Sequence, residues 1–185
     1  MWWKPMLLGV FAVSTIITGG LVYGVRRWQG KTEKLRAKLE AARLHIGPKT
    51  YSEDELVGLP APVQRYFRAV LTAGQPIVAA VRVEHMGTFN MSEAGQQWKP
   101  FTSTQRVITL GPGFLWDARI ALMPGLTARV HDAYIAGEGI LHAALFGLFS
   151  LANMRGTPEM AQGELMRFFA EAAWYPTALL PSQGV

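Results

Sequence analysis

The sequence predicts an α+β fold: a single N-terminal transmembrane helix, followed by a twisted antiparallel β-meander packed with amphipathic helices. Three observations predict this class. An uncharged apolar stretch occupies residues 6–25, four strand-like runs follow one another between residues 77 and 137, and helical patterns flank those runs. Strands joined by short turns pair antiparallel, because a parallel crossover needs a dozen residues or more.

The first element is the apolar stretch MLLGVFAVSTIITGGLVYGV at residues 6–25. At about 1.5 Å per residue, a helix of this length covers about 30 Å, the thickness of a bilayer's hydrocarbon core. A cleaved signal peptide fits less well, because its apolar region is usually about 7–15 residues long. We therefore expect residues 1–28 to be a transmembrane anchor. Its interfaces are marked by aromatic residues, namely Trp2, Trp3, Tyr23 and Trp28.

The positive charge of the chain is concentrated just after the anchor. The net charge is +5, yet residues 26–49 alone carry eight basic and two acidic residues. Since the rest of the chain is nearly neutral, this pattern indicates a membrane partner and disfavours nucleic acid. The positive-inside rule predicts a single-pass membrane protein with its soluble part in the cytoplasm. The spacing of Gly20 and Gly24 also allows a homodimer through the membrane span.

Residues 29–49 are expected to form a basic juxtamembrane helix and linker. Leu35, Leu39, Ala42 and Ile46 recur at helical spacing and form a narrow apolar stripe. Gly47 and Pro48 are expected to end this helix. The segment fits three roles: a stalk that continues the membrane helix, a helix lying on anionic headgroups, or a surface that pairs with a second copy.

Residues 50–185 are expected to form the α+β domain. Short helices are predicted near residues 52–55 and 60–73, and the four strand-like runs cover 77–91, 101–110, 113–122 and 126–137. The alternation of these runs predicts a sheet with one covered face. The run at 140–154 is apolar almost all round but too short to span a bilayer, so it is predicted to be a helix that is either buried or interfacial. A closing helix is predicted at 157–174, with Thr157 as its N-cap and Pro158 in its first turn.

Four segments in order resemble an uncharacterised bacterial family whose members carry a domain of unknown function, often behind a single membrane span. These segments are LPAPVQRYFRAVLTAGQP, FLWDARI, VHDAYIAGEG and GELMRFFAEAAWYPTALLP. The resemblance covers about residues 56–185 and implies no known activity, substrate or cofactor. Together with the apolar stretch, it implies a location in the bacterial inner membrane. Because the family's members continue past the last segment with further strands, it also implies that the chain is truncated at its C-terminus.

The stretch GFLWDARIAL places two charged residues together. Asp117 and Arg119 lie two positions apart on one predicted strand, so they share a face. If the next strand pairs around the turn at residues 123–125, Asp117 and Asp132 are expected to approach each other. Two close carboxylates can act as acid and base, as in glycoside hydrolysis. The simpler interpretation is an ion pair between Arg119 and a carboxylate that ties the sheet to the closing helix.

We hypothesise a non-enzymatic binding module for a lipid-like or other apolar ligand, held between the sheet and the helices that cap it. The alternatives are a carboxylate-dependent hydrolase, which would use Asp117, Asp132 or Glu171, and a membrane-tethered scaffold. Trp116 and Trp174 are expected to pack in the core. No cofactor or metal is expected, since the chain has no cysteine and no nucleotide-binding or metal-binding motif. The candidate ligand-binding residues are Trp116, Asp117, Arg119, Asp132, Tyr134, Arg167, Glu171 and Trp174.

Overall fold

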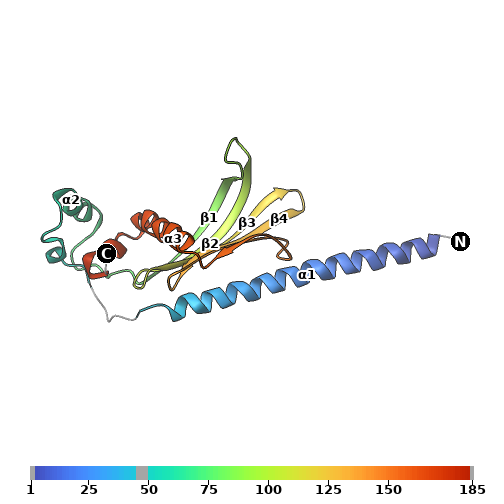
Figure 1. Ribbon diagram of the computed structural model, residues 1–185, viewed down its shortest axis with the longest axis horizontal. Coiled ribbons are helices and arrows are strands. Elements are labelled where there is room, and N and C mark those ends of the chain that lie inside the picture. Colours follow the sequence, from blue (N-terminus) through green and yellow to red (C-terminus); the bar gives the residue numbers. More distant parts are fainter. Residues whose placement is uncertain (1–2, 45–49, 184–185) are drawn as a thin grey trace.

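The computed structural model of the chain describes residues 3–44 and 50–183, with side chains from Leu7 onward (Figure 1). Its helices are α1 (Trp3–Ala41), α2 (Ala61–Val70) and α3 (Pro158–Glu171), with short 3-10 helices η1 (Glu53–Leu56), η2 (Ala172–Trp174), η3 (Pro176–Leu179) and η4 (Pro181–Gln183). Its strands are β1 (Ala80–Asn90), β2 (Trp98–Ile108), β3 (Gly113–Met123), β4 (Leu126–Ile135), β5 (Glu138–Leu145) and β6 (Phe149–Arg155).

The strands form one antiparallel sheet in the order β1-β2-β3-β4-β5-β6. Each strand pairs with the one before it, which confirms the predicted α+β meander behind a long apolar helix. The four predicted runs correspond to β1–β4. The predicted N-cap is also present, because the Thr157 hydroxyl accepts a hydrogen bond of 3.2 Å from the Met160 amide at the start of α3.

The predicted helix at 140–154 is wrong, because this segment forms β5, a turn and β6. Leu141 and Ala143 of β5 pack toward α3, whereas Ile140 and Ala144 lie on the opposite face and are buried. A strand with cover on both faces has no polar side to alternate with, so its sequence resembles a buried helix. The turn itself has positive φ at Phe146 and Gly147.

Helices cover both faces of the sheet, which corrects the expectation of one covered face. The C-terminal half of α1 lies along one face, and α3 lies on the other (Figure 1). On the α3 face, a core of aromatic and aliphatic side chains includes Phe114, Trp116 and Phe168. On the α1 face, Leu39 packs against a smaller core that includes Leu115 and Ile135.

Helix α1 is continuous from the apolar stretch into the basic segment. One window of it has a mean hydropathy of 1.8, so the helix is long and apolar enough to cross a membrane. The predicted stripe is used within the chain, because Leu35, Leu39 and Ala42 pack on the sheet rather than on lipid or a second copy. The helix ends at Ala41, earlier than expected. Residues 46–48, Trp2 and the side chain of Trp3 lie outside the described part.

The helix meets the sheet at a glycine. A Cβ atom on Gly24 would lie 2.5 Å from the Phe146 carbonyl oxygen and 2.7 Å from Leu148 Cγ, so only glycine admits the β5–β6 turn at this distance. Gly147, with φ of +74°, approaches the backbone of Gly24 from the other side. Gly24 therefore serves helix–sheet packing within one chain, whereas the sequence suggested that it could contact a second span. A Cβ on Gly20 would meet no atom within 4 Å.

We expect Gly24→Ala to destabilise the protein by about 1–3 kcal/mol, because the new methyl group forces the β5–β6 turn away from α1. For a chain of this size the loss corresponds to a fall in Tm of roughly 2–10 °C, which thermal unfolding of the detergent-extracted protein measures by tryptophan fluorescence.

Gly20→Ala is the matched control, because both substitutions change helix propensity equally. Equal Tm values for the two variants would show that the contact between α1 and the turn does not form.

Candidate functional site

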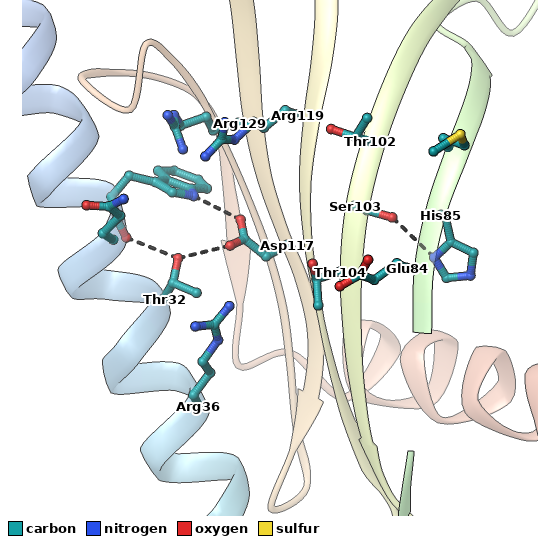
Figure 2. A pocket seen from close by; sticks show the side chains of 13 residues that line it. Thr32, Arg36, Glu84, His85, Thr102, Ser103, Thr104, Asp117, Arg119 and Arg129 are labelled. Atoms are coloured by element: carbon teal, nitrogen blue, oxygen red, sulfur yellow. Dashed lines mark hydrogen bonds between the residues drawn. The ribbon is translucent and has the colours of Figure 1, made fainter. Parts of the chain in front are cut away.

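A groove of about 450 Å³ lies between α1 and the sheet (Figure 2). Its walls come from one face of α1, from the first two strands and from the middle of the sheet, so it forms only when the helix is docked. Most of the lining side chains are polar or charged. They are Trp28, Gln29, Thr32, Arg36, Glu84, His85, Met86, Thr102, Ser103, Thr104, Asp117, Arg119 and Arg129.

Asp117 joins the sheet to α1. The Trp28 indole nitrogen donates a hydrogen bond of 3.1 Å to Asp117 Oδ1, and the Thr32 hydroxyl lies 3.3 Å from Oδ2 as a second donor (Figure 2). Hydrogen bonds to a carboxylate are stronger than those between neutral groups. The predicted link from Asp117 to the closing helix is therefore wrong: the residue faces the membrane-proximal helix instead.

A buried histidine completes the contact with α1. The His131 ring stacks on Trp28 with 4.0 Å between ring centroids, and Thr32 Oγ1 lies 2.7 Å from His131 Nε2. Burial, with the nearby positive charges, lowers the pKa of His131 to about 3, so the ring is neutral at pH 7. Trp28 is fully buried here. The expectation that Trp28 marks a membrane interface is therefore wrong.

Thr32, His131 and Asp117 are the residue types of a hydrolytic triad, but their geometry differs from one. The hydroxyl and the carboxylate both approach Nε2 of His131, the carboxylate at 3.6 Å. In a triad the acid instead holds the opposite ring nitrogen, so that the hydroxyl and the acid act at two ends of the ring. Thr32 is also buried. The three side chains therefore dock the helix rather than form a nucleophile and its base.

Two arginines stand side by side on the wall of the groove. Arg119 and Arg129 are direct cross-strand partners, and both extend from the sheet toward α1 (Figure 2). Arg129 is only 9% exposed. Neither arginine forms a salt bridge within 4.0 Å in the described part of the chain. Burial and the charge of Arg119 lower the pKa of Arg129 from its usual value, although Asp117 opposes this shift.

The remaining charged candidates meet on the opposite face. Arg167 of α3 forms ion pairs with Asp132 of β4 and, at 2.8 Å, with Glu171. Its guanidinium also lies 4.9 Å from the centroid of Phe114. Gln105 donates a hydrogen bond to Glu171. This network connects the sheet to the closing helix, the role that the sequence had suggested for Asp117 and Arg119.

The expected approach of Asp117 and Asp132 is wrong. The strand register pairs Asp117 with His131 and Trp116 with Asp132, so the two carboxylates point to opposite faces of the sheet. The acidic neighbour of Asp132 is Glu164 of α3. Burial and the charge of Asp132 raise the pKa of Glu164 to about 8. Two half-buried carboxyl groups at this contact disfavour a second negative charge, so Glu164 holds its proton to a higher pH than usual.

The aromatic candidates differ in how deeply they are buried. Trp116 is buried in the α3-side core, as predicted, and its ring lies 5.9 Å from that of Phe101. Tyr134 packs at the edge of this core. Trp174 is 61% exposed, so the expectation that it packs in the core is wrong. Within the described residues, no group of three or more His, Asp or Glu side chains is arranged to hold a metal ion.

Sequence reasoning missed the groove residues Trp28, Thr32 and Arg129, and the buried His131 that contacts Trp28 and Thr32. One signal was available, because a turn at residues 123–125 places Arg129 opposite Arg119 and His131 opposite Asp117. The strand pattern therefore already grouped two arginines, one histidine and one aspartate on one face. It carried no information that α1 would cover that face.

We expect the free energy of unfolding to fall as pH rises from about 6.5 to about 8. Below pH 6.5 the lowered pKa of His131 makes stability rise with pH and offsets the opposite effect of Glu164. Folding raises the pKa of Glu164 from 4.5 to about 8, so the folded state binds more protons across this window and loses stability as the solution becomes basic. Glu164→Gln, which keeps the shape but cannot ionise, should flatten this slope in urea titrations at several pH values. Glu159→Gln, an exposed change on the same helix, should keep the wild-type slope, and a wild-type slope in both variants would contradict the assignment.

The comparisons with known proteins identify a family and no activity. A model of a family of unknown function, DUF6920, matches residues 57–185. These residues include the whole sheet, α3 and all groove residues except those of α1. No curated protein and no solved structure matches the chain. The chain therefore belongs to DUF6920, a family of unknown function.

Proposed function

We propose that the chain is a membrane-anchored, non-enzymatic binding module that holds an anionic group in the groove between α1 and the sheet. The observation that carries this proposal is Arg129, a buried arginine whose cross-strand neighbour is a second arginine. The apolar part of α1 supports the anchor, and the basic residues that follow it support a cytoplasmic position for the domain.

The two neighbouring arginines repel each other, and a negative charge placed between them would stabilise both. Like charges directly opposite on paired strands are destabilising, and a buried charge is costly unless it is paired. The nearest acid, Asp117, is already engaged by Trp28 and Thr32. A bound anion would supply the missing charge. The planar guanidinium group suits phosphate and carboxylate oxygens in particular, because it can donate two parallel hydrogen bonds.

The size and lining of the groove also favour binding of a small ligand. Its volume of about 450 Å³ lies within the usual range for ligand pockets, roughly 300–1,000 Å³. The walls are more polar than the apolar pocket expected from the sequence. A ligand with a charged head therefore fits better than a purely apolar one.

The hydrolase alternative receives less support from the geometry. Its three carboxylates are split between the two faces, with Asp117 bonded to α1, and Asp132 and Glu171 both paired with Arg167. Asp132 Oδ1 and Glu164 Oε2 are shielded from solvent. Catalysis requires an acid and a base that reach the same substrate. These groups instead act in holding helices to the sheet.

We expect inorganic phosphate to stabilise the full-length protein in detergent, because the anion binds the folded groove and not the unfolded chain. At ten times its dissociation constant the gain is about 1.4 kcal/mol, which thermal unfolding detects as a Tm increase of roughly 3–6 °C.

Arg129→Gln should weaken the apparent affinity for phosphate at least tenfold, as measured from the dependence of Tm on phosphate concentration. Arg106→Gln is the matched control, since Arg106 is an exposed arginine on the same face of the sheet and should respond as the wild type does. A phosphate response that is unchanged in Arg129→Gln would exclude the arginine pair as the binding site.

A further inference from the structure

A second cavity adjoins the arginine pair on the side of the membrane segment. It has a volume of about 290 Å³ and is lined by Leu21 and Val25 of α1, by Phe146 of the β5–β6 turn, and by Arg119 and Arg129. The two arginines also line the polar groove. The two arginines therefore lie between the polar groove and the second cavity. The second cavity has Leu21, Val25 and Phe146 on its other side and lies beside the last residues of the apolar stretch.

The two turns that contribute Gly125 and Phe146 to this cavity are followed or preceded by exposed apolar side chains. The β3–β4 and β5–β6 turns point along α1 toward its N-terminal part (Figure 1). Met123 at the first turn is 60% exposed, and Phe149 and Leu151 after the second are 65% and 58% exposed. The second turn packs on Gly24, next to the end of the uncharged stretch at residues 6–25. These side chains are thus level with the membrane boundary that the helix defines.

A ligand that satisfies both compartments has an anionic head and a hydrocarbon tail. The head meets two guanidinium groups, and the tail passes between aliphatic and aromatic side chains. A soluble phosphate ester satisfies only the first requirement. A bilayer lipid satisfies both, and it reaches the cavity without crossing water because the opening lies at the boundary itself.

We propose that the groove takes the headgroup of a membrane phospholipid, with the phosphate on Arg119 and Arg129 and the acyl chains leaving past Leu21, Val25 and Phe146. This inference rests on the proposed function and names its ligand class. The lipid enters from the bilayer through the cavity beside α1. The helix is therefore both the anchor of the domain and one wall of its lipid site.

The test uses the full-length protein, extracted in detergent and supplied with phosphatidylglycerol. Native mass spectrometry should detect one retained phosphatidylglycerol on the wild type, and Arg129→Gln should reduce the retained fraction at least tenfold. Val25→Phe should also lose the lipid, because the larger ring fills the apolar opening, but it should keep the thermal response to inorganic phosphate. Val22→Phe, the same substitution at a side chain that is 47% exposed and does not line the cavity, should retain the lipid.

The possible outcomes separate this inference from the proposed function. A phosphate response that depends on Arg129, without any retained lipid on the wild type, would overturn the lipid assignment and leave the anion site. Equal lipid retention in the wild type, Arg129→Gln and Val25→Phe would also overturn it, because the lipid would then bind elsewhere. If Arg129→Gln changes neither lipid retention nor the phosphate response, both proposals fail.

Discussion

The docking of α1 on the sheet depends on one carboxylate. Asp117 accepts hydrogen bonds from side chains of α1 that are 89 and 85 positions away in the chain. Thr32 connects this carboxylate to the buried His131, which stacks on Trp28. Because the groove has α1 as one wall and the sheet as the other, this contact also determines the shape of the candidate ligand site.

The two faces of the sheet use charged residues in different ways. On the α3 face, Arg167 is matched by Asp132 and Glu171, so the ionic groups satisfy one another and hold the helix. On the α1 face, Asp117 is matched by neutral donors, and within the described residues neither of the two arginines near it forms a salt bridge. A network whose charges are paired within the chain stabilises the fold. A buried cation without an ion-pair partner is costly, and binding an external anion would remove this cost. This difference is the reason for placing the ligand site on the α1 face.

The position of the site relative to the membrane follows from the continuity of α1. A helix that runs unbroken from an apolar stretch into a docked segment transmits the orientation of the span to the domain. The contact of Gly24 with the β5–β6 turn then brings the sheet against the end of the apolar stretch. A flexible linker between anchor and domain would have left this relation undefined.

Local sequence patterns were sufficient to predict the long apolar part of α1, the amphipathic stripe at Leu35 and Leu39, and the strands β1–β4. These features depend on local periodicity, which a single segment carries. The sequence also grouped Asp117 with Arg119, because alternation along a strand assigns them to one face. It misread β5, because a strand covered on both faces has no polar side to alternate with; the error extended to β6, whose residues are mostly exposed.

The choice of which helix covers which face became visible in the folded structure alone. The pairing of Asp117 with Trp28, and of Asp132 with Arg167, depends on packing between segments that are distant in the chain, and no local pattern encodes such a choice. For the same reason the structure alone revealed Arg129 as a buried arginine beside Arg119. Its burial comes from the strands and helix around it, and its own sequence neighbours resemble those of any half-exposed strand.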